Sequence, residues 1–194
     1  MSSALQPRTE AAGWTALLER FYARAGLTLP PLEPLKDGEV PRPYKALLVH
    51  SQDMTPTLEN FYRQPLGLTV LSRERHNDSY YREVILTVEN GARPVAYGAI
   101  RIHLDHLPPA VRQRVLEEHR PFGNILQGES LPHISWPQAF FRVQSDSHTS
   151  SVLHLRRACV LYGRRNVLLD GSRQLLAEVI EILAPVSRTD LNRE

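Results

Sequence analysis

The chain has 194 residues, of which 42% are hydrophobic and 23% charged, which is enough for one well-filled core and short for two. Its 23 basic and 21 acidic residues are spread throughout, so we expect no nucleic-acid partner. Cys159 is the single cysteine, which excludes an internal disulfide and a cysteine-rich zinc site. No stretch approaches the roughly 20 apolar residues that cross a bilayer, and the first residues lack the apolar centre of a signal peptide. We therefore expect a cytoplasmic protein that does not insert into membranes.

Residues 1–43 predict one helix followed by an extended connector. Thr9 suits the N-cap of this helix and Gly26 its end. The apolar residues between them recur at helical spacing: Trp14, Leu17, Leu18, Phe21, Tyr22 and Ala25. Segment 29–43 is so rich in proline that we expect neither a helix nor a paired strand there.

Residues 44–194 predict one domain of short strands and a few helices. We expect strands over 45–50, 66–74, 80–88, 95–104 and about 138–143, followed by a closing hairpin over 161–185. Helices begin at Thr55-Pro56 and at Pro108-Pro109, and Asn90-Gly91 predicts a hairpin loop longer than two residues. Because strands and helices segregate instead of alternating, the pattern predicts an α+β fold. Its antiparallel sheet would carry helices on one face.

Charged residues inside these apolar strands require an explanation. Arg82 shares one strand face with Tyr80, Val84, Leu86 and Val88, so its guanidinium points where the core should be. A buried guanidinium needs a planar partner with two oxygens. A carboxylate ligand supplies such a partner. Glu178 or Glu181 also supplies one in a structural ion pair, and spacing alone favours the ion pair over the ligand.

Other chemistries have weaker signals in the sequence. His103-Leu-Asp-His106 is the densest histidine cluster, but on a strand His103 and His106 would face opposite ways, and no HExxH motif is present. Hydrogen-bonded or solvated histidines are therefore the preferred interpretation, and we expect no metal. No serine lies in GxSxG, and neither GxGxxG nor a Walker loop occurs, so we expect no organic cofactor.

Several separated motifs belong together. They are Asp53-Met54-Thr55, Arg82-Glu83-Val84-Ile85-Leu86, Asn90-Gly91 with Pro94, Pro121-Phe122-Gly123, Tyr162-Gly163-Arg164-Arg165 and Leu175-Leu176-Ala177-Glu178-Val179. In order and spacing, over residues 44–185, this set resembles the bacterial chorismate lyases. Those enzymes convert chorismate to 4-hydroxybenzoate and pyruvate.

The resemblance implies an antiparallel sheet with helical flaps over an internal ligand cavity. It implies that Arg82 and Glu178 bind the aromatic acid and that Met54 and Phe122 wall the cavity. Counting from the hairpin turn favours Glu178, whereas counting back from Pro185 favours Glu181, so both glutamates stay candidates. The catalysis implied is a cofactor-independent elimination, driven by aromatisation of the ring, and the family's pathway is ubiquinone biosynthesis.

The Arg164-Arg165 pair has two interpretations under this resemblance. One of the two arginines would attract the second carboxylate of the substrate, or it would brace the hairpin. We expect at least one of them to brace the hairpin.

The chain also departs from the family pattern. Phe122 replaces a leucine, Asn166 replaces a serine, and the final loop is one residue shorter. Two alternatives therefore remain. One is a lyase acting on a modified chorismate. The other is a non-catalytic binder of a small aromatic or carboxylic acid, like the effector domains of some transcription regulators, which resemble the lyase fold. Those regulators usually carry a winged-helix domain, which the single helix before the connector does not supply.

Overall fold

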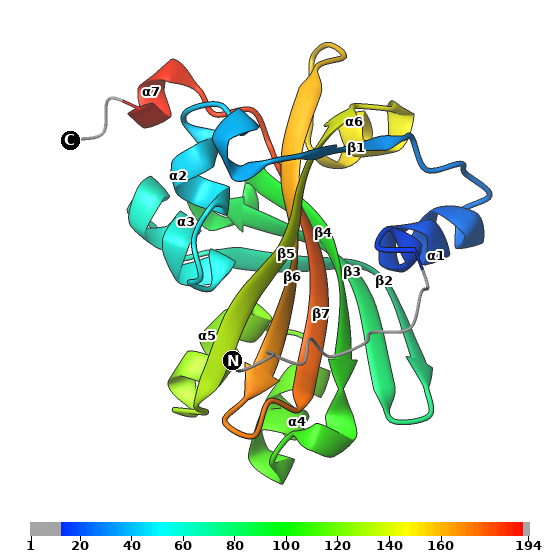
Figure 1. The fold of residues 1–194 in the computed structure, drawn as a ribbon, viewed down its shortest axis with the longest axis vertical. Coiled ribbons are helices and arrows are strands. Elements are labelled where there is room, and N and C mark those ends of the chain that lie inside the picture. The colour runs from blue at the N-terminus through cyan, green and yellow to red at the C-terminus, as the bar shows by residue number, and fades with distance from the viewer. Residues whose placement is uncertain (1–12, 192–194) are drawn as a thin grey trace, which may run out of the picture.

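The computed structural model describes residues 13–191, which form one seven-stranded antiparallel sheet with helices around it (Figure 1). The strand order across the sheet is β1-β5-β6-β7-β4-β3-β2. The strands are β1 (Leu32–Leu35), β2 (Gly67–His76), β3 (Ser79–Val88), β4 (Arg93–His103), β5 (His133–Gln144), β6 (Val160–Asp170) and β7 (Leu175–Leu183). The α-helices are α1 (Ala16–Arg24), α2 (Tyr44–Leu48), α3 (Met54–Tyr62), α4 (Pro109–Leu116), α5 (Phe122–Gly128), α6 (Ser147–Val152) and α7 (Arg188–Leu191). Three short 3₁₀ turns are η1 (Asp37–Glu39), η2 (Glu89–Gly91) and η3 (Leu104–His106).

The predicted α+β class and antiparallel sheet are confirmed. Strands β2, β3 and β4 and the closing hairpin β6–β7 lie where the sequence predicts them. The β3–β4 connection contains η2, so the loop is longer than two residues, as expected. In it Asn90 takes a φ of 55°, a left-handed conformation that asparagine tolerates better than most residues.

Two sequence predictions about local structure are wrong, and a third falls outside the described residues. The segment predicted as a strand over residues 45–50 forms α2 instead, because it lacks a pairing partner and buries Leu47 and Leu48 against the sheet. The proline-rich segment does contribute a strand, since β1 pairs with β5. Pro34 is tolerated there because β1 is an edge strand. Helix α1 begins at Ala16, and the predicted cap Thr9 lies outside the described residues.

Helices cover both faces of the sheet, not one. On the first face, one apolar cluster joins α2 and α3 to the sheet and a second joins α4 and α5 to it. On the opposite face a third cluster joins α1 to the sheet through Leu18, Phe21 and Tyr22. Figure 1 shows α2, α3 and α5 on one side of the central strands and α1 on the other.

A buried carboxylate on the α1 face is fully accounted for. Glu83 accepts hydrogen bonds from Tyr97 Oη at 2.7 Å and from His148 Nε2 at 2.8 Å. His148 lies on α6, so this contact ties α6 to the sheet.

Over residues 13–191, none of the helices combines the length and apolar character that crossing a membrane requires.

Candidate functional site

A cavity of about 60 Å³ lies on the first face, between the sheet and helices α3 and α5. It separates the two apolar clusters of that face, and both contribute to its wall. The apolar lining comprises Met54, Leu68, Val84, Leu86, Ala96, Ile100, Phe122, Leu168 and Val179. The polar side chains at its surface are Asp53, Thr55, Arg82, Asn166 and Glu181.

Arg82 is the cationic residue of this cavity. It is 1% exposed, and neither its Nε nor its Nη1 has a hydrogen-bond partner among residues 13–191. Burial lowers the pKa of its guanidinium, although Tyr80 and Glu118 oppose that effect. Glu118 is already bonded to Tyr80 and to Arg73. Within the described residues Arg82 is therefore a buried cation without an ion-pair partner. The structural ion pair that spacing favours is not formed, because Glu181 pairs with Arg164 and Glu178 with Arg165.

Glu181 supplies a carboxylate to the same cavity. Its side chain is 15% exposed, and its Oε2 accepts a hydrogen bond from Arg164 Nε at 2.9 Å. Burial raises the pKa of Glu181, against the opposing effect of the Arg164 charge. Of the two candidate glutamates, Glu181 is thus the one on the same face as Arg82.

Arg164 holds Glu181 and also anchors the chain between α2 and α3. Its side chain is fully buried, and its Nη atoms donate to the carbonyl oxygens of Leu48, His50 and Gln52 at 3.2 to 3.4 Å. Since its donors are directed at Glu181 and at three backbone carbonyl oxygens, Arg164 braces the wall of the cavity.

Glu178 and Arg165 lie on the opposite face of the sheet. Arg165 Nη2 donates to Glu178 Oε1 at 2.9 Å, and Arg101 approaches the same carboxylate at 3.5 Å. Because β7 alternates faces, Glu178 cannot share the cavity with Glu181. The pairing of Arg82 with Glu178 that the resemblance implies is therefore absent from this structure.

Asp53 and Asn166 add hydrogen-bonding groups at the cavity surface. Asp53 Oδ2 accepts from His133 Nε2 at 2.7 Å, and this contact raises the pKa of His133. Asn166 Nδ2 donates to Ser135 Oγ at 2.9 Å. Asp53 Oδ1 and Asn166 Oδ1 are both buried without a partner among the described residues, so each offers an acceptor toward the site.

The strand register separates the cationic side chain from the acceptors. Arg82 pairs with Ile100, and Ile100 with Val179, whereas Glu181 lies between Gly98 and Arg164 in the neighbouring row. Arg82 on β3 and Glu181 on β7 are thus two strand spacings apart, about 9.5 Å across the sheet. The cavity has a cationic end and an acceptor end with apolar walls between them.

Asp53 and Asn166 were not predicted as site residues. Asp53 stands in one of the sequence motifs, and Asn166 differs from the family pattern. The available signal for Asn166 was its place on a strand face, two residues before the apolar Leu168. For Asp53 the signal was its position as N-cap of a helix next to the predicted wall residue Met54. Met54 and Phe122 themselves both line the cavity.

Comparison with known proteins identifies the fold. No protein-family model matches the sequence, and no curated protein matches it either. Among solved structures, the effector domain of PhnF from Mycobacterium smegmatis matches with a TM-score of 0.51 and 8% identity, over 78% of this chain and 91% of that chain. PhnF itself matches with a TM-score of 0.51 and 9% identity, over 86% and 92%. A GntR-family transcriptional regulator from Bacillus cereus gives a TM-score of 0.46 and 12% identity, over 62% and 92%.

The chain has the same fold as the effector domain of PhnF. The sequence resemblance implies the same kind of fold, since such effector domains resemble the chorismate lyases. At these identities the likeness extends to the fold alone.

Proposed function

We propose that this effector-domain fold binds a small aromatic carboxylic acid in its internal cavity, without converting it. The observation that carries the proposal is Arg82, a buried guanidinium with two unsatisfied nitrogen donors at the cavity surface. Burying an unpaired charge is costly, and it is retained in proteins where something pairs with it.

A carboxylate is the partner that fits Arg82 best. It offers two oxygens in a plane to a planar donor group, and the resulting hydrogen bonds are charge-assisted. Glu118 does not take this role in the structure, because its two carboxylate oxygens already accept hydrogen bonds from Tyr80 and Arg73. The ligand carboxylate would therefore neutralise the guanidinium at the β3 end of the cavity.

The opposite end of the cavity favours a hydrogen-bond donor on the ligand. Glu181, Asn166 and Asp53 all present acceptor oxygens there. The walls between the two ends are aliphatic and aromatic, which suits a flat ring. A ring with a carboxylate at one end and a hydroxyl at the other, as in 4-hydroxybenzoate, meets both requirements.

Helices α3 and α5 must yield for such a ligand to bind. A cavity of about 150 Å³ holds benzene, whereas the cavity here is about 60 Å³. Both helices contribute lining residues, Met54 from α3 and Phe122 from α5. We therefore assign them the role of flaps that move away from the sheet together when the ligand enters.

Calorimetric titration with matched ligands tests the proposal. We expect 4-hydroxybenzoate to bind with one ligand per chain and 4-hydroxybenzyl alcohol, which lacks the carboxylate, to bind at least about tenfold more weakly. The affinity for benzoate, which lacks the hydroxyl, should lie between the affinities for the acid and the alcohol. Equal affinity for the acid and the alcohol would refute the role assigned to Arg82.

Turnover of chorismate by the same cavity is the second candidate. It is favoured because four residues implied by the lyase resemblance, Arg82, Met54, Phe122 and Glu181, line one cavity. The reaction would break the bond between the ring and the enolpyruvyl oxygen and remove the C4 hydrogen, which gives 4-hydroxybenzoate and pyruvate. The aromatic product drives this step, so the protein mainly has to hold the side chain in a reactive geometry.

Incubation of the protein with chorismate separates the two candidates. Equal amounts of 4-hydroxybenzoate and pyruvate, formed faster than in a protein-free control, would establish the lyase. Binding of chorismate or 4-hydroxybenzoate without product formation is the result that the non-catalytic proposal predicts. A different hydroxybenzoate, or turnover only of a modified chorismate, would indicate a lyase with altered substrate.

A further inference from the structure

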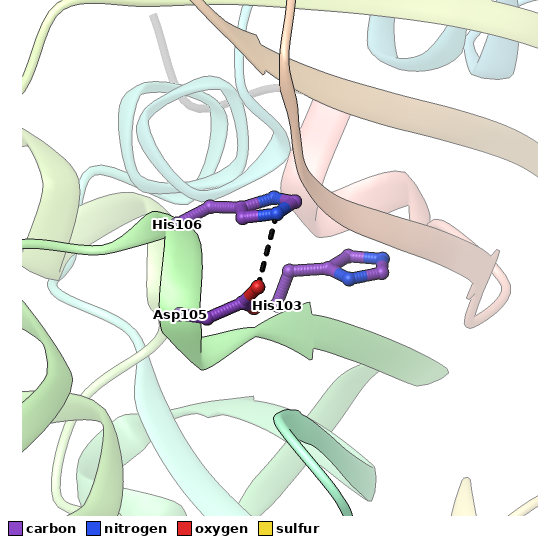
Figure 2. Close-up of side chains that lie close together, drawn as sticks. All are labelled: His103, Asp105 and His106. Atoms are coloured by element: carbon purple, nitrogen blue, oxygen red, sulfur yellow. Dashed lines mark ion pairs between the residues drawn. The ribbon is translucent and has the colours of Figure 1, made fainter.

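A cluster of three metal-ligating side chains lies at the end of β4, away from the cavity. The side chains of His103, Asp105 and His106 each place one nitrogen or oxygen within 4.8 Å of the other two (Figure 2). The sequence predicts that the two histidines diverge, as they would on a continuous strand. They converge because β4 ends at His103 and η3 turns the chain back.

The η3 turn is held firmly in this position. Leu104, its first residue, and Leu107, directly after it, are both buried, and Leu104 N donates to Asp78 O at 2.8 Å. The imidazole rings of His103 and His106 consequently stack, with centroids 5.2 Å apart and planes 11° from parallel.

The hydrogen bonds of His106 leave one nitrogen facing a carboxylate. Its Nδ1 lies 2.6 Å from the carbonyl oxygen of Leu175, and a carbonyl only accepts, so Nδ1 carries the proton. The other ring nitrogen, Nε2, lies 3.2 Å from Asp105 Oδ2. Because Nδ1 carries the proton, Nε2 can present its lone pair to a metal ion that Asp105 Oδ2 also binds.

His103 offers a further donor atom. Its Nε2 is buried and has no hydrogen-bond partner among residues 13–191. This nitrogen is therefore available to a metal ion.

We propose that His103, Asp105 and His106 form a binding site for a divalent transition-metal ion of the zinc type. Two imidazoles and one carboxylate are a ligand set that zinc accepts, with water in the remaining position. The bond from His106 Nδ1 to a backbone carbonyl is the support that metal-ligating histidines commonly have. Asp105 is 47% exposed at its side chain, so the ion has access from solvent.

The distances and local charge are compatible with zinc. Zinc–ligand bonds of about 2.0 to 2.1 Å in a tetrahedron put the ligand atoms about 3.3 Å apart, and His106 Nε2 and Asp105 Oδ2 already have nearly that separation. The ligand atom of His103 lies within 4.8 Å of the other two, so His103 has to turn toward them when the ion binds. Arg101 opposes a cation here, and Glu178, which lies 3.5 Å from Arg101 but also pairs with Arg165, offsets only part of that charge. The carboxylate of Asp105 supplies the negative charge of the site itself.

Zinc titration of the full chain, purified without a histidine tag, tests this proposal by calorimetry. We expect one zinc ion per chain, with an affinity that falls at least roughly tenfold in His106→Gln and in His103→Gln. The matched control is His154→Gln, an exposed histidine outside the cluster, which should bind zinc like the wild type. Circular dichroism of each variant verifies that it is folded.

Cobalt substitution gives a second measurement that does not depend on the variants folding. Co²⁺ bound to the wild-type chain should give the intense visible absorption of a four-coordinate site, and zinc should displace it. Failure of the folded wild type to bind zinc or cobalt, or equal zinc affinity in His106→Gln and the wild type, would overturn the proposal.

Discussion

Two buried arginines on the same face of the sheet have opposite surroundings. Arg164 donates to Glu181 and to backbone carbonyl oxygens, whereas Arg82 has two guanidinium nitrogens without partners among the described residues. A charge that is fully paired contributes to the fold, and a charge left unpaired reduces stability. The two residues should therefore respond in opposite ways to the same substitution.

We expect Arg82→Met to stabilise the ligand-free protein by about 1 to 3 kcal/mol. Methionine has a similar length and removes a buried, unpaired charge. The free energy of unfolding in urea measures the change. A substantial loss of stability would mean that Arg82 has a structural partner, contrary to the role assigned here.

The matched substitution Arg164→Met should destabilise the protein by about 3 kcal/mol or more. It leaves the Glu181 carboxylate buried without its cation and removes the donors to the α2–α3 chain. The same urea titration makes the comparison. Equal stability of the two methionine variants would contradict the distinction between an anchoring and a ligand-binding arginine.

The Asp53–His133 contact predicts a pH dependence. The pKa of His133 is raised in the folded state, so the contribution of this contact is fully present below about pH 6.5 and is lost as pH rises through the folded-state pKa. We therefore expect His133→Gln to cost about 1.5 kcal/mol at pH 5.5 and clearly less at pH 8.5. Urea unfolding at both pH values measures this, and a penalty that grows with pH would contradict the assignment.

At the scale of elements, β7 is held very close to both neighbouring strands around Glu181. A Cβ added at Gly98 would lie 2.5 Å from Ile180 O, and one added at Gly163 would lie 2.4 Å from Glu181 O. These positions accept only glycine without a shift of the backbone. The close approach fixes where β7 presents Glu181 to the cavity.

We expect Gly163→Ala to destabilise the protein by about 1 to 3 kcal/mol, because the added methyl group forces β6 and β7 apart. The control is Gly171→Ala in the β6–β7 turn, where an added Cβ meets no atom within 4 Å. Thermal unfolding of both variants measures the difference. Similar melting temperatures for the two would contradict the tight packing of these strands.

Helices α3 and α5 pack closely enough to move as one unit. A Cβ at Gly123 would lie 3.0 Å from Thr55 Oγ1, so the start of α5 touches the start of α3. If these helices are flaps, a bound ligand should slow amide hydrogen exchange in both, while α1, on the opposite face, stays unchanged. Exchange followed by mass spectrometry with and without 4-hydroxybenzoate measures this. Equal protection of all three helices would argue against a local opening.

At the scale of the whole molecule, the sequence predicts the central strands of the sheet better than it predicts helix α2 and the edge strand β1. Strand β3 is predictable because apolar residues alternate around Arg82 in a simple period of two. Segment 45–50 reads equally well as a strand, and only its packing on the sheet makes it α2. Strand β1 depends on its pairing with β5, which is distant in sequence.

The candidate site shows the same limit. Arg82, Met54 and Phe122 were predictable because each stands in a motif of the resemblance, and all three line the cavity. The choice between Glu178 and Glu181 was not predictable from the sequence. Alternation along the strand places the two side chains on opposite faces but does not show which face holds the cavity. The convergence of His103 and His106 depends on the end of β4, which their spacing does not reveal.

The central claim is that Arg82 anchors a carboxylate ligand, and titration of 4-hydroxybenzoate into wild type, Arg82→Met and Arg142→Met tests it most directly. Arg142 is an exposed arginine on β5, paired with Glu33, and serves as the control. We predict that the wild type and Arg142→Met bind alike and that Arg82→Met loses about a hundredfold in affinity, the value of a charge-assisted hydrogen-bonded pair. Undiminished binding by a folded Arg82→Met variant would contradict the account.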